Sequence, residues 1–274
     1  APQEIEKLKG EAIEFLERYF ELEKIANEKS KFSNPVADME IKDKKDAEKA
    51  AKLVRKRWRL GNGPIKNVIG MLEAQGIKVY RAEYPETFNG FSAWAGTIPI
   101  IVVNFGIKEI TRVRFTALHE LGHLILQVPD EVDGKILEKI CDAFASELLL
   151  PTEMLILELG TFRSAISMQE LKAIKEKFGI SVLAIMVRTH IARIITSQTY
   201  NVWKMNYDKD VINETGDFGE YSGDELSRRF DQLLFKCLVE EKISINKAAS
   251  LSGKSVSTLY REHKLNNAIY NYLQ

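Results

Sequence analysis

The sequence has few cysteines, few histidines and no long apolar run. Its two cysteines, Cys141 and Cys237, are too few for a disulfide scaffold and are typical of a reducing compartment. No apolar run approaches the roughly 20 residues that a membrane-spanning helix needs, and the first residues lack the apolar stretch of a secretion signal. We therefore expect a cytoplasmic protein without a membrane partner.

The chain also lacks an excess of either charge. Lys plus Arg and Asp plus Glu each number 39 among 274 residues, so a surface for nucleic acid would have to be a local patch. Hydrophobic residues make up 45% and charged residues 28%, which is ordinary for a globular protein and excludes a disordered or fibrous chain. The length predicts about two domains.

Hydrophobic periodicity predicts many helices and a small sheet. Apolar residues recur every three or four positions over 4–28, 46–60 and 65–75, and again from residue 111 onward. An alternating run predicts a strand at 77–80, and a hairpin is expected from 91–95 and 98–103 around Gly96-Thr97. Pro99 favours a sheet edge or a strand start. The fold class is thus α+β, mostly helical.

Two of the four histidines lie in His119-Glu120-Leu121-Gly122-His123, inside an apolar segment that reads as a buried helix. Roughly 0.006 such patterns would arise by chance in a chain of this composition. Residues four apart share one helix face, so both imidazoles can bind one ion at ~2.0–2.1 Å. Glu120 lies about 100° further round the helix, where it can act as general base on a water bound to that ion.

A catalytic zinc site needs a third protein ligand and one open position. Glu138 lies in the first turn of a predicted helix over 137–150. Pro129 and Gly134, which precede this helix, allow it to fold back antiparallel to the first helix. We expect Glu138 to be the third ligand, and an exposed helix acid is the alternative. Asp142, one turn later, can accept the free N–H of a ligating histidine. Cys141 is expected as a small buried apolar residue rather than a ligand.

The stretch from Arg114 through the His119–His123 motif, followed by Glu138-x-x-Cys-Asp-Ala-Phe-Ala and Leu148-Leu-Leu-Pro151, resembles the ImmA/IrrE metallopeptidases. The resemblance extends over roughly 47–151. It departs from the family pattern at Cys141, where Ala is usual, and at Asp142, where Asn is usual. It implies a zincin-like core and a protein substrate, often an Xre-type helix-turn-helix repressor. The expected ion is Zn²⁺, and Mn²⁺ is the alternative because affinity order and metal supply both decide which ion is bound.

Together these features predict four regions. They are a helical N-terminal arm (1–33), a zincin-like ImmA/IrrE peptidase domain (34–160), a helical helix-turn-helix-like segment (161–204), and a linker with a C-terminal helical region (205–274). The residues 206–224, rich in Asp, Gly and Asn, are expected to be a mobile linker. Asn104, at the end of the second hairpin strand, is expected to make a turn hydrogen bond, with a substrate contact as the alternative.

The leading hypothesis is a zinc-dependent intracellular endopeptidase that cuts a regulatory protein. In it, the ion activates a water, Glu120 takes its proton, and the hydroxide attacks a peptide carbonyl. If the strand at 98–103 lies at a sheet edge, it could bind an extended peptide by strand addition. The alternative hypothesis is a DNA-associated regulator with a structural or sensory metal. It rests on two helix-turn-helix-like segments, 171–188 and 243–261, the second of which lies in a stretch of net positive charge.

Overall fold

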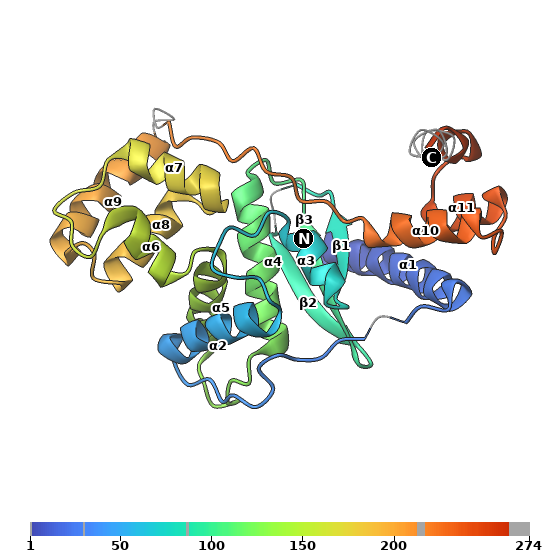
Figure 1. Cartoon of the computed structure of the whole chain (residues 1–274), viewed down its shortest axis with the longest axis horizontal. Helices are drawn as coiled ribbons and strands as arrows, with labels where there is room; N and C mark the ends of the chain where they lie inside the picture. Colours follow the sequence, from blue (N-terminus) through green and yellow to red (C-terminus); the bar gives the residue numbers. More distant parts are fainter. Residues whose placement is uncertain (1, 30, 86–87, 213–216, 263–274) are drawn as a thin grey trace.

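The computed structural model describes residues 2–29, 31–85, 88–212 and 217–262 (Figure 1). The strands are β1 (Lys78–Ala82), β2 (Gly90–Ala95) and β3 (Ile98–Asn104). The helices are α1 (Pro2–Ala26), α2 (Lys44–Arg57), α3 (Val68–Ala74), α4 (Ile110–Ile125), α5 (Gly134–Leu149), α6 (Thr152–Leu159), α7 (Met168–Phe178), α8 (Val182–Ile191), α9 (Ser197–Ile212), α10 (Arg229–Val239) and α11 (Ile245–Ser252). This arrangement confirms the mostly helical α+β fold class.

The sheet has the strand order β1-β3-β2, with β1 parallel and β2 antiparallel to β3. The hairpin is confirmed. Of the two positions that Pro99 favours, the sheet edge is wrong because β3 is central, and the strand start is confirmed because Pro99 is the second residue of β3. Pro99 pairs with Trp94, and β1 pairs with β3 only from Ile100 onward. Counting from the two-residue turn, Trp94 and Pro99 form a non-hydrogen-bonded pair, so the missing N–H leaves no gap in the sheet.

Helices cover both faces of the sheet. Ile101 and Val103 of β3 are buried in the main core with α4, whereas Ile100 and Val102 pack with the first half of α1 on the opposite face. A strand that is buried on both faces reads as a continuous apolar run, which is the pattern of 98–103. Helix α5 then packs between α4 and α2, so that α4 lies between the sheet and α5.

The N-terminal and C-terminal helices form one cluster. Tyr19 and Leu22 of α1 are buried against Leu233 and Leu234 of α10 and Leu251 of α11. Figure 1 shows α1, α10 and α11 together at one end of the molecule. The arm and the C-terminal region, expected as separate regions, therefore share an apolar core.

The structure describes residues 206–212 and 217–224 of the segment expected to be a mobile linker, and both parts are fixed by contacts with the rest of the chain. Residues up to Ile212 continue α9, and residues 217–228 run as an extended strap across the core. Glu225 in this strap is fully buried and forms an ion pair with the fully buried Arg114 of α4. Asp217 forms an ion pair with Lys172 of α7. Burial and charge pairing thus outweigh the loop-like composition.

Most cations of the two helix-turn-helix-like segments form ion pairs within the chain. In α7 and α8, Lys172, Lys175, Lys177 and Arg188 form ion pairs with Asp217, Glu109, Glu158 and Glu147 respectively. In the C-terminal segment, the lysines at 242, 247 and 254 form ion pairs with Glu240, Glu21 and Asp231. Much of the charge that favoured contact with DNA is therefore neutralised.

Candidate metal centre

The His-Glu-Leu-Gly-His motif lies in the second half of α4, which is held in the core by buried apolar residues such as Leu118, Leu121 and Ile125. His119 and His123 are one turn apart, and they are only partly exposed, at 15% and 24% of their side-chain surface. Helix α5 begins with Asp133, whose carboxylate accepts from the Lys135 N–H as an N-cap. Its first turns carry Glu138 to the histidine face of α4.

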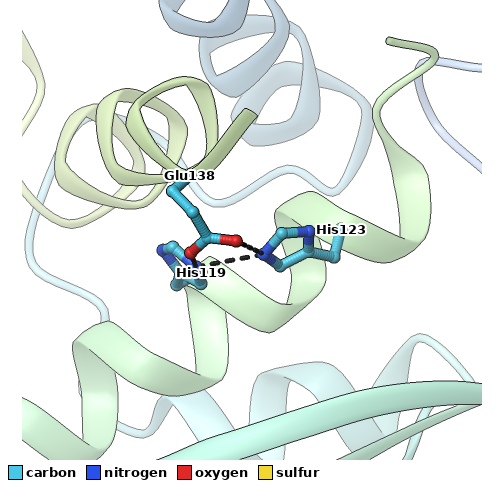
Figure 2. Close-up of side chains that lie close together, drawn as sticks. All are labelled: His119, His123 and Glu138. Carbon is cyan, nitrogen blue, oxygen red and sulfur yellow. Dashed lines mark hydrogen bonds and ion pairs between the residues drawn. The ribbon is translucent and has the colours of Figure 1, made fainter. Parts of the chain in front are cut away.

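The three expected metal ligands meet at one point (Figure 2). His119 Nε2 lies 3.0 Å from Glu138 Oε2, and His123 Nε2 lies 3.3 Å from Glu138 Oε1. The two Nε2 atoms are 3.1 Å apart. Ligand atoms at ~2.0–2.1 Å around a tetrahedral ion are about 3.3 Å apart, so this spacing fits a zinc-sized cation. The Glu138 side chain is 58% exposed, which leaves one side of the cluster open to solvent.

Asp142 lies behind His119 rather than among the three. Its Oδ1 is 2.9 Å from His119 Nδ1, which orients the ring so that Nε2 points toward Glu138. Burial lowers the pKa of His119, but the hydrogen bond and negative charge of Asp142 outweigh it, together with the charges of Glu138 and Glu120. The net result is a pKa above the ordinary 6.5.

Glu120 reaches the edge strand of the sheet. Its Oε2 accepts a hydrogen bond from the Ser92 hydroxyl of β2 at 2.9 Å. A Cβ at Gly90 would lie 2.8 Å from Thr116 Cγ2, so this glycine allows β2 to approach α4 closely. Sequence reasoning missed Ser92. A lone hydroxyl between Phe91 and Ala93 is its only local signal, because its partner is 28 residues away.

Gly122 has a packing role that its spacing alone did not reveal. A Cβ built at Gly122 would lie 3.2 Å from both Cβ and Sγ of Cys141. The glycine therefore allows α4 and α5 to approach closely where they carry the ligands. Cys141 is fully buried, which raises the pKa of its thiol to about 12 and keeps it protonated. It is not among the clustered ligand atoms of the described residues.

Asn104 is fully buried, so its side chain is not accessible to a substrate. Its Oδ1 accepts from the N–H groups of Tyr84 and Gly106, and its Nδ2 donates to the carbonyls of Pro85 and Phe88. The amide oxygen and the amide nitrogen of its side chain thus each make two hydrogen bonds to the turns around the end of β3. These are the turn hydrogen bonds that the sequence predicts.

A helix with the His-Glu-x-x-His motif, packed on a small sheet and facing a second helix with an acidic side chain, defines the zincin-like metallopeptidase class. Residues 72–190 match the family model described as IrrE N-terminal-like domain, Peptidase_M78. This part of the chain, somewhat less than half of it, belongs to the ImmA/IrrE family of metallopeptidases. No curated protein gives a significant match to the chain.

The family match begins later than the resemblance seen in the sequence and continues beyond Pro151 through α7 and most of α8. The contacts explain this extent, because Arg188 of α8 forms a buried ion pair with Glu147 of α5, and Arg114 of α4 donates to the Gly179 carbonyl between α7 and α8.

Among the described residues, no helix has the length and apolar character needed to cross a membrane.

Proposed function

We propose that this protein is a zinc-dependent intracellular endopeptidase that hydrolyses a peptide bond of a regulatory protein. The observation that carries the proposal is the convergence of two imidazoles and one carboxylate at 3.0–3.3 Å with one side open to solvent. Two imidazoles and a carboxylate are the donor set that suits a catalytic zinc, and manganese is the alternative ion. The two buried free cysteines accord with a reducing compartment.

His119, His123 and Glu138 would hold the ion, and Asp142 would keep the His119 ring in the ligating orientation. A divalent ion bound there lowers the pKa of water and polarises a substrate carbonyl. Glu120 would accept the proton of the attacking water and deliver it to the leaving amine. The Ser92 hydroxyl would hold the Glu120 carboxylate toward the space between α4 and β2.

Strand addition would use β2 rather than β3, since β2 is the edge strand. In the described part of the sheet, β2 pairs only with β3. The alternation of pairs directs the backbone groups of Ser92 and Trp94 away from β3, where an extended peptide could bond to them. Because Ser92 also reaches Glu120, a peptide on this edge would lie beside the general base.

The identity of the substrate rests on the family resemblance, which implies an Xre-type helix-turn-helix repressor. The alternative function, a DNA-associated regulator, draws little support from the cations of α7, α8 and the 242–254 stretch, because they are paired to acids of the same chain.

The decisive experiment compares zinc-loaded wild type with Glu120→Gln. Both are incubated with the repressor encoded beside the gene and with a proteome-derived peptide library. We expect wild type to cleave, a chelator to stop cleavage, and Glu120→Gln to retain stoichiometric zinc but lose activity. Glu131→Gln, an exposed carboxyl in the loop after α4, is the matched control and should cleave normally. Equal cleavage by Glu120→Gln, or failure of wild type to bind zinc, would refute the proposal.

A further inference from the structure

A cavity of about 590 Å³ opens beside the metal centre, between α4, α5, α8 and α9. Two of its lining residues connect it to that centre. Asp142 lies 2.9 Å from His119 Nδ1, and the ring of Phe115 lies 6.4 Å from the ring of His119. Both lie one helical turn from a ligand, Phe115 before His119 and Asp142 after Glu138. One turn of helix is about 5.4 Å.

The wall of the cavity is largely apolar and comes both from the two ligand-bearing helices and from helices outside the motif. Phe115 and Ala143 contribute from α4 and α5, and Leu183, Ala184 and Val187 contribute from α8. Further wall residues, including Tyr207 of α9, lie beyond the family match at 72–190. The helix-turn-helix-like segment thus contributes its second helix to a cavity next to the reacting centre.

The rim of the cavity is basic. Lys44 of α2, Arg112 of α4 and Lys139 of α5 line it and are exposed. Neither Lys44 nor Lys139 forms an ion pair with a residue that the structure describes. Of the two acids at the cavity, Glu109 is paired with Lys175 at 2.7 Å, and Asp142 is engaged by His119. The charge available to a ligand at this rim is therefore positive.

We propose, building on the endopeptidase function, that this cavity selects the substrate. It receives one bulky apolar side chain of the target segment, while acidic side chains next to it contact Lys44 and Lys139. An extended peptide advances about 3.3 Å per residue, so a cavity one helical turn from the ligands accepts a side chain within two residues of the scissile bond. The substrate class is an apolar–acidic protein segment.

A binding assay tests the cavity without requiring turnover. The probe is a fluorescent decapeptide with a central Phe flanked by Glu, titrated by anisotropy into the zinc-loaded full chain carrying Glu120→Gln. Replacing the Phe of the peptide by Ala should weaken binding about ten- to a hundred-fold, because the buried apolar surface is lost. Replacing its Glu residues by Lys should weaken binding about three- to ten-fold or more.

Matched variants of the protein localise the effect. Lys44→Glu with Lys139→Glu should remove or reverse the preference for the acidic peptide, whereas Lys56→Glu, an exposed lysine of the same helix as Lys44, should not. Val187→Asp should abolish the Phe preference, and Val202→Asp, at a 52% exposed position on α9, is its control. Zinc content and thermal unfolding establish that each variant is folded.

The outcomes separate this inference from the proposed function. Binding of the probe with both preferences, but without cleavage by wild type, would leave the cavity assignment standing and refute the endopeptidase. Cleavage that depends on Glu120, combined with no Phe or Glu preference in binding or in the library cut sites, would overturn the cavity assignment alone. Unchanged preferences in the Lys44→Glu, Lys139→Glu double variant would overturn the role of the basic rim even if Val187→Asp does not fold.

Discussion

The Ser92 hydroxyl donates to the Glu120 carboxylate at 2.9 Å and so connects the edge strand of the sheet to the helix that carries the two histidines. A charged acceptor makes this a strong hydrogen bond, and it fixes one rotamer of the residue that we assign as general base. Under the proposed function, the bond would also couple the position of a peptide bound along β2 to the position of the base.

Ser92→Ala should therefore lower kcat about ten-fold while leaving KM and zinc content near the wild-type values, since the β2 backbone is kept. Ser92→Thr retains a hydroxyl and should restore most of the rate. Steady-state kinetics on the cleaved repressor or peptide would measure both. A wild-type kcat in the alanine variant would show that Glu120 needs no such support.

Asp142→Ala should weaken zinc affinity about 10- to 100-fold, because the acceptor that orients His119 is lost. Asp142→Asn keeps an oxygen at this position and matches the residue usual in the family, so its loss should be much smaller. Asp142→Asn should also lower the pKa of His119, because it removes the negative charge of Asp142 that raises this pKa. Competition titration against a zinc dye, and NMR titration of the metal-free chain, would test the two effects.

Gly122→Ala should destabilise the fold by about 1–3 kcal/mol, because the new methyl would overlap Cys141 where α4 meets α5. Adding Cys141→Ala removes the thiol and should recover part of the loss. Gly134→Ala, where a Cβ meets nothing within 4 Å, is the control and should be neutral or stabilising. Urea denaturation of wild type, these variants and the Cys141→Ala single variant gives the free energies of unfolding, and additivity in the double variant would exclude the contact.

Glu225→Ala should cost about 3–5 kcal/mol, because it leaves the fully buried guanidinium of Arg114 without its ionic partner. The exposed neighbouring change Asp224→Asn should have little effect. Hydrogen exchange of the 217–228 strap should rise in the first variant only. Wild-type stability in Glu225→Ala would mean that the strap is not anchored by this ion pair.

Stability should depend on pH through Glu170. Its hydrogen bond from Arg163, with those from the backbone and hydroxyl of Ser167, lowers its pKa from 4.5 to about 2. A carboxyl with a depressed pKa in the folded state stabilises the fold above the unfolded pKa, and this contribution disappears as the pH falls toward 2. Glu170→Gln should thus be less stable than wild type at pH 7, and the gap should close between pH 4.5 and 2.

For this test, Glu176→Gln is the control, since Glu176 is an exposed acid on the same helix. Thermal melts of the three chains across this pH range would give the comparison. A gap that is constant with pH would show that the effect of the substitution is not electrostatic.

The local pattern of the sequence determined much of this protein. The four-residue spacing of His119 and His123 requires only that the segment be helical, and the apolar residues around it make it so. The acid at Glu138 and the hairpin could be predicted for the same reason, because helical and strand periodicities depend on residues that are close in sequence.

Tertiary structure alone decided the rest, because it depends on contacts between distant residues. Only the strand order places β3 at the centre and β2 at the edge, and only the packing of α4 on α5 makes Gly122 necessary. Composition made 206–224 look like a linker, yet the fully buried charge of Arg114 is paired with the carboxylate of Glu225, and this ion pair holds the strap against the core.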